Sequence, residues 1–368
     1  MRVALVRTAG QERAEVRDDA NVRPLTPTDV RVQIKVSGVC HSDLSAMQGV
    51  LPNRMPFVLG HEGAGIVAEV GAEVSALKTG DHVIVCWVPP CGHCVFCLRG
   101  EGNLCTEIFI PTAQTPNFTV PAPDTESPAA QTPVYGMCGT GTLADEVVLP
   151  WQCAIRIPED VPFDVAALIG CGVTTGVGAV FNTAGVQPGS TVAVIGCGGV
   201  GIAVIQGARI AGAAEILAID PSAAKRDLVG KFGATRAAAP EDARGVMKEL
   251  TGKQGFDYVF ECVGRSELVR QAYDLARRGG RVVVVGAGRR DDKVEFSMGE
   301  LFYDNKMILP TMYGGGDVRT EYGRLIALWR AGKLDLESMV TARLPLERVD
   351  EALDLLRSGE AIRTVIEL

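Results

Sequence analysis

Apolar and polar residues alternate along the first part of the chain in the manner of half-buried β-strands. The stretch VRVQIKV at residues 30–36 places an apolar side chain at every second position. Turn residues interrupt the pattern at KTGD, residues 78–81, and around VPPCG, residues 88–92. We therefore expect a β-rich, antiparallel region that extends to about residue 150.

The pattern changes between about residues 172 and 312, where short apolar runs alternate with helical segments. The expected strands are TVAVI, EILAI, DYVFE and RVVVVG, which begin at residues 191, 215, 257 and 281. Alternating strands and helices are typical of a doubly wound parallel sheet. The predicted fold class is therefore α/β, with a doubly wound (Rossmann) domain inserted in a β-rich domain.

Two further segments have distinct patterns. ERVDEALDLLRSG, residues 347–359, is amphipathic, and a short terminal strand follows it. Residues 106–136 are rich in Pro, Thr and Ala and are expected to form a long ordered loop. That loop is either a simple insertion or a wall of the substrate entrance.

Composition limits the class of protein. The chain has 368 residues, 47% of them hydrophobic, and 43 glycines, which is enough for two domains with many tight turns. A net charge of −8 argues against a surface for nucleic acid or anionic membranes. Neither a membrane span nor a signal-peptide core is expected, and the eleven cysteines suit a reducing cytoplasm better than a disulfide framework.

The run CGHCVFCLRGEGNLC carries the strongest chemical signal. It brings together four thiols, Cys91, Cys94, Cys97 and Cys105. Four thiolates form a closed shell of the kind that holds a structural zinc ion. An iron–sulfur cluster is the alternative metal centre, but bacterial cluster motifs have three residues before the fourth Cys and a Pro after it, whereas seven residues intervene here and Thr106 follows. Four ordinary thiols remain the non-metal alternative.

A second group of metal-binding residue types lies outside that run. Its members are Cys40 and His41 in GVCHSD, His61 and Glu62 in GHEGAG, and Cys171 in IGCGVTTG. A Cys/His/Cys shell leaves one tetrahedral position open, and an open position distinguishes a catalytic zinc from a structural one. These residues are too far apart in sequence for spacing alone to show that they converge.

The segment TVAVIGCGGVG predicts a dinucleotide site. Gly196, Gly198 and Gly201 follow a strand in G-x-G-x-x-G spacing and lead into an apolar helix. The glycines allow a tight turn close to a pyrophosphate, whose charge the helix N-terminus stabilises. Asp220 ends the next strand, where a carboxylate binds the adenosine ribose hydroxyls.

The whole chain resembles the zinc-dependent medium-chain alcohol dehydrogenases. The motifs that carry the resemblance are GHEGAG, CGHCVFC, IGCGVTTG, GCGGVG and the terminal AIRTVIEL, in the family's order. The resemblance implies a GroES-like catalytic domain at residues 1–171 with a structural zinc lobe, an NAD-binding Rossmann domain at 172–312 and a return to the catalytic domain at 313–368. It also implies two zinc ions per chain, NAD as cofactor and a homodimer or homotetramer.

Site residues follow from the resemblance one by one. Cys40, His61 and Cys171 match the catalytic zinc ligands, and Cys171 favours the alcohol branch over the polyol branch, which tends to have Glu there. Ser42 matches the hydroxyl that takes the alcohol proton, Asp43 a carboxylate behind the zinc-bound His, and Glu62 a carboxylate behind the metal. Matches to cofactor contacts are His41, Thr175, Gly196, Gly198, Gly199, Val200, Gly201, Asp220, Lys225 and Arg363. Several of these side chains have ordinary structural alternatives, such as a helix cap or a solvent-exposed charge.

Two departures from the family bear on mechanism and substrate. Ser45 stands where liver-type members carry a His, so water is an alternative end of the proton relay. Phe109 stands where the branch that oxidises a glutathione adduct of formaldehyde has an Arg for the adduct's carboxylate. The other implied pocket residues are Ser42, Leu51, Trp87, Ile110, Met137 and Cys138.

These features together predict NAD-dependent oxidation of a bulky primary alcohol to an aldehyde, or the reverse, by hydride transfer from a zinc-bound alkoxide. We expect S-(hydroxymethyl)glutathione to be a poor substrate. Two alternatives are a dismutase that never releases its nucleotide and a non-catalytic protein that retains the zinc and dinucleotide sites.

Overall fold

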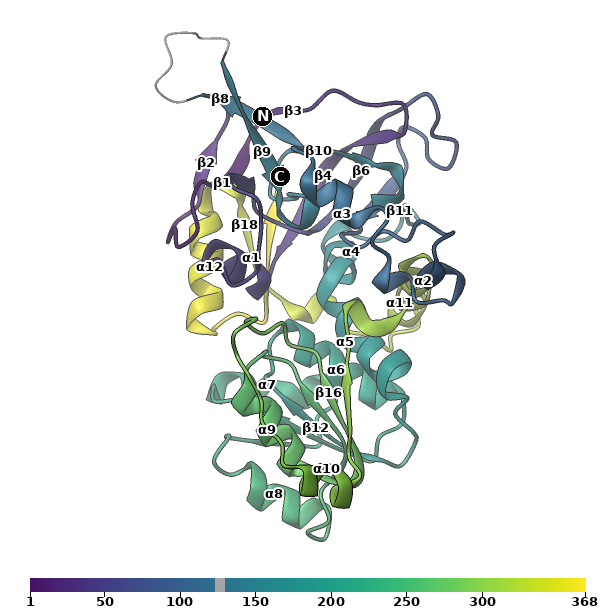
Figure 1. Cartoon of the computed structure of the whole chain (residues 1–368), viewed down its shortest axis with the longest axis vertical. Coiled ribbons are helices and arrows are strands. Elements are labelled where there is room, and N and C mark those ends of the chain that lie inside the picture. Colours follow the sequence, from purple (N-terminus) through teal and green to yellow (C-terminus); the bar gives the residue numbers. More distant parts are fainter. Residues whose placement is uncertain (123–129) are drawn as a thin grey trace. The chain divides into compact units, whose positions relative to one another are not determined.

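The structure is a computed structural model that describes residues 1–122 and 130–368. Its contacts divide the chain into two compact units (Figure 1). Unit 1 comprises Met1–Cys171, Asp317–Ile326 and Leu336–Leu368, and unit 2 comprises Gly172–Gly316 and Ala327–Asp335. The chain thus leaves unit 1 and returns to it twice.

The larger sheet of unit 1 is built around β4 (Asp29–Val39). Its order is β11-β7-β6-β4-β19-β18, and β10 also pairs with β4. The other members are β6 (Glu62–Val70), β7 (His82–Val85), β10 (Glu146–Pro150), β11 (Ala154–Arg156), β18 (Val340–Pro345) and β19 (Arg363–Glu367). The alternation predicted at residues 30–36 is visible in β4, because Val30, Val32 and Ile34 are buried.

A second sheet of unit 1 has the order β2-β1-β5-β9-β8-β3. Its strands are β1 (Val3–Val6), β2 (Glu15–Arg17), β3 (Asn21–Val22), β5 (Phe57–Val58), β8 (Phe118–Pro121) and β9 (Gln131–Gly136). The expectation of an antiparallel region is wrong at one pair, since β5 runs parallel to β9. In the C-terminal return, β18 likewise runs parallel to β19.

The long loop expected at residues 106–136 is replaced by regular structure. This segment forms α3 (Phe109–Gln114) and the antiparallel pair β8 and β9, and its middle, residues 123–129, lies outside the described residues. Buried Phe118 and Val120 on β8 face the core with Val134 of β9. The prolines do not exclude a strand here, because Pro121 is the last residue of β8, where the missing N–H of proline is tolerated.

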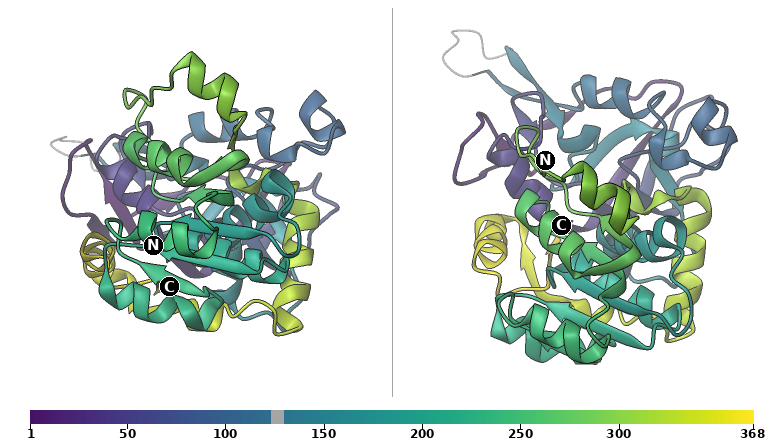
Figure 2. Two further views of the ribbon diagram at one scale, coloured as in Figure 1. Left: turned by 90° about the horizontal axis from the view of Figure 1, so that it is seen from below. Right: turned by 60° about the horizontal axis from the view of Figure 1, so that its bottom comes forward.

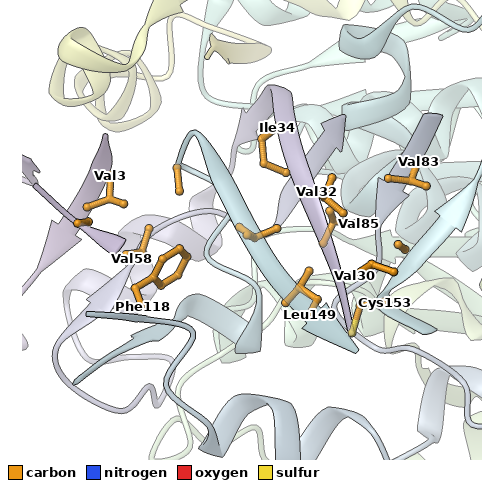
Figure 3. Packing of buried hydrophobic residues seen from close by; sticks show 14 of the residues in the cluster. Val3, Val30, Val32, Ile34, Val58, Val83, Val85, Phe118, Leu149 and Cys153 are labelled. Atoms are coloured by element: carbon orange, nitrogen blue, oxygen red, sulfur yellow. The ribbon is translucent and has the colours of Figure 1, made fainter. Parts of the chain in front are cut away.

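Side chains from both sheets of unit 1 fill a common core. Val32, Val85 and Leu149 come from β4, β7 and β10, and Figure 3 shows them close together. Val3, Val58 and Phe118 belong to the same cluster but come from the second sheet. The two sheets of the β-rich half therefore share an apolar cluster.

Unit 2 contains a six-stranded parallel sheet of order β14-β13-β12-β15-β16-β17. Its strands are β12 (Thr191–Ile195), β13 (Glu215–Ile219), β14 (Arg236–Ala238), β15 (Phe256–Glu261), β16 (Ala276–Val284) and β17 (Met307–Pro310). This is the strand order of a doubly wound dinucleotide fold, which confirms the predicted fold class. Figure 2 shows helices flanking the sheet in both views.

Further helices belong to both units. They are α1 (His41–Met47), α2 (Val95–Leu98), α6 (Gly199–Ile210), α7 (Ala223–Phe232), α8 (Ala243–Leu250), α9 (Ser266–Leu275), α10 (Met298–Asp304), α11 (Val318–Arg330) and α12 (Val349–Ser358). The predicted amphipathic segment at 347–359 contains α12, whose buried residues include Leu353 and Leu356.

A continuous apolar helical stretch runs over Phe163–Ala184 and changes its winding along its length. It consists of α4 (Phe163–Leu168), a π-helical segment Ile169–Val173, α5 (Thr174–Gly178) and a second π-helical segment Ala179–Ala184. The stretch is long and apolar enough to cross a membrane by length and composition, but 89% of its apolar window is buried inside the protein. It is therefore best described as a core helix.

Candidate functional site

Four metal-ligating side chains from distant segments converge in unit 1. Cys40 follows β4 as the N-cap of α1, His61 precedes β6, Glu62 begins β6, and Cys171 lies in the first π-helical segment. Their ligand atoms lie within 4.8 Å of one another, and all four residues are buried. The structure thus brings these residues together, which their spacing in the sequence alone could not show.

Asp43 ties two of these segments together. Its Oδ2 accepts the N–H of Cys40 at 2.8 Å and its Oδ1 accepts the N–H of Gly60, next to His61, at 2.9 Å. The same carboxylate faces His61, but the Oδ1–Nδ1 distance of 3.8 Å is longer than a hydrogen bond. Asp43 therefore holds the backbone around the predicted ligands, and its contact with the imidazole remains a prediction.

The donor set fits a zinc ion. A hydrogen bond from Cys171, together with His61, lowers the pKa of Cys40 well below its usual value. The same hydrogen bond, together with burial, raises the pKa of Cys171. One sulfur is thus already poised as the thiolate that zinc prefers, and the other requires a cation to ionise. Two sulfurs and an imidazole leave room for a fourth ligand.

Glu62 and Arg363 form a buried ion pair behind this cluster. Arg363 Nη2 lies 3.0 Å from Glu62 Oε1, and both side chains are almost fully buried. A Cβ on Gly38 would lie 2.2 Å from Glu62 Oε2, so only glycine leaves space for that carboxylate. Burial, opposed by Arg363, raises the pKa of Glu62 to about 7. Arg363 therefore contacts a carboxylate in this structure, and its predicted pyrophosphate contact is not tested.

The π-helical winding at Cys171 is a feature that the sequence pattern did not predict. A π-helical turn is wider than an α-helical turn and is frequent at functional sites. The apolar composition of IGCGVTTG is equally compatible with a regular helix. Cys171 lies in this wider turn, and its sulfur is within 4.8 Å of the ligand atoms of Cys40 and His61.

Ser42 lies beside the cluster on the first turn of α1. Its Oγ is 3.7 Å from Cys40 Sγ, which places a hydroxyl next to a predicted zinc ligand. Ser45 is half-buried on the same helix. His41, the predicted pyrophosphate contact, is exposed at the start of α1. The relay and pyrophosphate roles remain predictions.

Aromatic side chains extend away from the metal ligands. The rings of His61 and Trp87 make an edge contact with centroids 6.3 Å apart, and Trp87 makes another with Phe109 at 6.2 Å. Leu51 and Cys138 are half-buried and pack against the same apolar cluster as Met137, which is fully buried. Ile110 is exposed on α3, beside Phe109. Met137 is therefore a core residue.

The four-cysteine lobe has the geometry of a tetrahedral site. Cys91 Sγ lies 3.9 Å from Cys97 Sγ, and Cys94 Sγ lies 3.9 Å from Cys105 Sγ. Four sulfurs about 2.3 Å from one zinc would be about 3.8 Å apart. Burial raises the pKa of Cys91, but N–H groups of His93 and Cys94 outweigh it and lower that pKa to about 6. The lobe thus fits a zinc ion with four thiolate ligands.

The glycine turn of unit 2 has the conformation that its motif predicts. Gly196 has φ +90°, and a Cβ on Gly201 would lie 1.8 Å from the Gly196 carbonyl oxygen. Gly198 is the N-cap of α6, and no atom lies near the position of its missing Cβ. Gly199 and Val200 form the first turn of α6. The backbone is therefore open to a phosphate at this helix N-terminus.

Asp220 lies at the carboxyl end of β13, beside this turn. Its Oδ2 accepts the N–H of Cys197 at 2.8 Å and its Oδ1 accepts the N–H of Ser222 at 2.9 Å. Lys225 is half-buried on α7, and Thr175 is half-buried on α5. Each Asp220 oxygen keeps a free lone pair, so the carboxylate can still accept hydrogen bonds from a ribose.

Sequence reasoning missed two charged residues close to these sites. Arg319, at the start of α11, pairs with Asp317 and lies 3.1 Å from the position of a Cβ on Gly92, inside the four-cysteine lobe. Glu261 ends β15 and is fully buried. A charge directly after an apolar run, followed by Cys-Val-Gly, was the available signal for Glu261.

Comparison with known proteins agrees with this geometry. Residues 26–159 match the family described as alcohol dehydrogenase GroES-like domain, and residues 199–329 match the family described as zinc-binding dehydrogenase. The chain is 38% identical over 356 residues to an S-(hydroxymethyl)glutathione dehydrogenase of Photobacterium damsela subsp. piscicida, with 95% of each chain covered. The enzyme of the same name from Paracoccus denitrificans is 35% identical over 350 residues, with 92% of each covered.

A solved structure extends the comparison to three dimensions. The benzyl alcohol dehydrogenase of Acinetobacter calcoaceticus superimposes with a TM-score of 0.88 at 28% identity. The alignment covers 100% of this chain and 99% of that one. The likeness therefore spans both units.

Proposed function

Because the chain belongs to the zinc-dependent medium-chain alcohol dehydrogenases, we propose that it uses NAD to oxidise a bulky, uncharged primary alcohol to its aldehyde, or to catalyse the reverse. Alcohol oxidation with zinc is common to the family, and NAD is its typical nucleotide. The choice of substrate and the preference for NAD are specific to this proposal.

The aromatic series His61, Trp87 and Phe109 is the observation that supports a bulky substrate. Each ring meets the next edge-on, beginning at a predicted zinc ligand. Aromatic and aliphatic walls with few polar groups suit an apolar side chain on the substrate. The hydroxyl to be oxidised would then lie beside His61, with its substituent along Trp87.

The proposed chemistry divides between cofactors and protein. When bound, zinc acts as a Lewis acid that lowers the alcohol's pKa, and the nicotinamide ring accepts the hydride. Cys40, His61 and Cys171 would hold the zinc, with Asp43 fixing the backbone beside Cys40 and His61. The Ser42 hydroxyl would take the alcohol proton while passing its own proton on to water.

The names of the relatives favour a second candidate substrate, S-(hydroxymethyl)glutathione. They are 35% and 38% identical to this chain over more than nine-tenths of its length. Phe109 argues against this substrate, because a carboxylate against an aromatic ring is desolvated without a compensating charge. In this chain Phe109 contacts Trp87 and offers no cation.

Substitution at Phe109 tests the choice between these substrates. We expect the native enzyme to have a higher kcat/KM for benzyl alcohol than for S-(hydroxymethyl)glutathione, and Phe109→Arg to narrow or invert that ratio. Gln114→Arg is the matched control, because Gln114 is exposed on the same helix, outside the predicted pocket, and its replacement adds the same charge. A native enzyme that prefers the glutathione adduct would contradict the proposal.

A tightly held nucleotide is an alternative mode of action. A dismutase of this kind would couple oxidation of one alcohol to reduction of one aldehyde without releasing NAD. Nucleotide that co-elutes with the protein on gel filtration would favour the dismutase. NADH that accumulates with free NAD and alcohol favours the proposal.

We propose that the protein is a homodimer that pairs through unit 2. Strand β17 is an edge of the parallel sheet, and α10 beside it exposes Met298, Phe302 and Tyr303, each more than two-thirds accessible. An unpaired edge next to large exposed apolar side chains suits a second copy of the chain. Phe302→Asp should therefore shift the molar mass measured by light scattering from dimer to monomer.

The cytoplasm is the proposed location. All eleven cysteines lie in the described part of the chain and are free thiols. A protein with so many cysteines and no disulfide among its described residues suits a reducing compartment.

A further inference from the structure

Glu261 is a buried carboxyl group at the carboxyl end of β15. Its side chain has no exposed surface. Oε1 accepts the N–H groups of Val263 and Gly264, both at 2.8 Å, whereas buried Oε2 has no hydrogen-bond partner among the described residues. Glutamate is almost never fully buried unless it is paired, so its presence here calls for a role.

Glu261 joins the loops that follow two neighbouring strands. Its carboxylate holds Val263 and Gly264 after β15. Its main-chain carbonyl oxygen accepts the N–H groups of Val285 and Gly286 after β16, at 2.8 and 3.0 Å. The loops are in direct contact, because a Cβ on Gly286 would lie 2.0 Å from the Gly264 nitrogen. Gly264 itself has φ +89°, a conformation that glycine adopts without strain.

The first of these loops also packs on the dinucleotide turn. A Cβ on Gly196 would lie 2.6 Å from Val263 Cγ2, and the Cys262 N–H donates to the Ile195 carbonyl at 2.9 Å. A shift of Val263 would therefore also shift the glycine turn that faces the pyrophosphate. Glu261 is linked to that turn through one residue.

Strand order indicates which part of the nucleotide meets these loops. β12 lies between β13, which ends in Asp220, and β15, and β16 is the next strand beyond β15. A dinucleotide lies across the carboxyl ends of such a sheet, with one mononucleotide half on each side of the central strand. Asp220 marks the adenosine half, so the loops after β15 and β16 face the nicotinamide half.

We propose that Glu261 is a positioning residue for the nicotinamide half of the nucleotide. Its carboxylate fixes the loop after β15, on which Gly286 of the loop after β16 packs, and so shapes the surface against which that half binds. This inference rests on the proposed use of NAD. Glu261 touches neither substrate nor ring and acts through the backbone of residues 262–265 and 285–288.

Nucleotide affinity tests this role without measuring turnover. We expect Glu261→Ala to raise the Kd for NADH, measured by fluorescence titration of the zinc-loaded protein, about tenfold, a change of the size that loss of one buried hydrogen-bond network produces. The Kd for AMP, which contains only the adenosine half, should change less than about twofold. Glu261→Gln keeps an acceptor at Oε1 and should restore most of the NADH affinity.

Asp257 provides the matched control on the same strand. It lies at the opposite end of β15, where its carboxylate accepts from Thr191 and pairs with Arg277. Asp257→Ala should lower the melting temperature but leave the Kd for NADH unchanged. If Glu261→Ala does not fold, Glu261→Asp replaces it in the test. Aspartate is one methylene shorter, so its carboxylate is drawn back from Val263 and Gly264, and the Kd for NADH should rise.

Two results would overturn the inference, and they differ from failure of the proposed function. Native NADH affinity in Glu261→Ala, or in Glu261→Asp if the alanine variant does not fold, would contradict a positioning role. Equal losses of NADH and AMP affinity would show that Glu261 supports only the general fold. A native enzyme that binds no NADH would refute the use of NAD itself.

Discussion

Asp220 is the residue predicted to select the nucleotide. Its two oxygens accept backbone N–H groups from the glycine turn and from the start of the next loop, at 2.8 and 2.9 Å. These bonds orient the carboxylate. A ribose can share the remaining lone pairs, whereas a 2′-phosphate would meet a negative charge that is already fixed in place.

We therefore expect a strong preference for NAD over NADP. A like-charge contact costs roughly several kcal/mol, which corresponds to a reduction of kcat/KM by at least about a hundredfold. Arg226 does not remove this penalty, because its guanidinium already donates to the carbonyl oxygens of Asp220 and Pro221. Steady-state rates with both nucleotides and one alcohol provide the measurement.

Asp220→Ser should narrow that preference, because the charge disappears while a short acceptor remains. Equal kcat/KM for NAD and NADP in the unmodified enzyme would show that Asp220 does not select the nucleotide.

At the residue scale, the sequence could identify side chains but not their backbone bonds. Asp220 was predictable from its distance to the glycines, and Cys40, His61 and Cys171 from motifs. The bond between Asp43 and Gly60 joins residues 17 positions apart in sequence. Such contacts depend on how β4 and β6 pair, which periodicity does not specify.

The four-cysteine lobe is the element that depends most on a metal. It contains only short helical turns, and burial raises the pKa of Cys97 to about 12, so a thiolate there needs a compensating cation. Structural zinc contributes directly to folding free energy.

Cys97→Ala should therefore lower the melting temperature and leave one zinc per chain, held at Cys40, His61 and Cys171. Proteolysis within residues 91–105 should become faster, as mass spectrometry of the fragments would show. Cys153→Ala is the control, because Cys153 is a buried thiol remote from both clusters and its replacement should keep two zincs. A Cys97→Ala protein that retains two zincs would contradict the assignment.

The pair Arg23 and Asp29 connects β3 to β4 and gives stability a defined pH dependence. Their nearest atoms are 2.5 Å apart, and Asp29 is buried. Burial alone would raise the pKa of Asp29, but Arg23 and Thr26 outweigh it and lower that pKa. A carboxyl group with a lowered folded-state pKa stabilises the fold above its unfolded pKa, about 3.9, and loses this effect as the pH falls through the folded value.

Asp29→Asn should lower the free energy of unfolding at pH 7 by about 3 kcal/mol, because it leaves Arg23 without its charge partner. In urea denaturation the difference from the native protein should shrink steadily below about pH 4. The same difference at pH 3 and pH 7 would show that the ion pair does not contribute in this way.

At the scale of elements, regular apolar periodicity predicts strands well, whereas an irregular, proline-rich stretch does not reveal its secondary structure. The strands at 191–195 and 215–219 coincide with β12 and β13, because a continuous apolar run bounded by turns has few alternatives. The proline content of residues 106–136 predicts a loop, but the segment contains α3, β8 and β9. Its strand signal rests on Phe118, Val120 and Val134, whose burial depends on partners elsewhere in the chain.

At the scale of the whole molecule, the sequence predicted the architecture better than its connections. Alternating strands and helices predict the doubly wound parallel sheet that unit 2 contains. The division of α11 between the two units does not, since residues 317–326 belong to unit 1 and 327–335 to unit 2. An amphipathic helix identifies its buried face but not the unit against which that face packs.

Alcohol oxidation at a zinc ion held by Cys40, His61 and Cys171 is the central claim, and turnover of Cys171→Ala tests it most directly. The measurement is NADH formation from NAD and benzyl alcohol, on samples whose zinc content is known. We expect the native enzyme to carry two zincs and produce NADH. The variant should keep its fold and one zinc but show no turnover. Native iron in place of zinc, or undiminished turnover in the variant, would contradict the account.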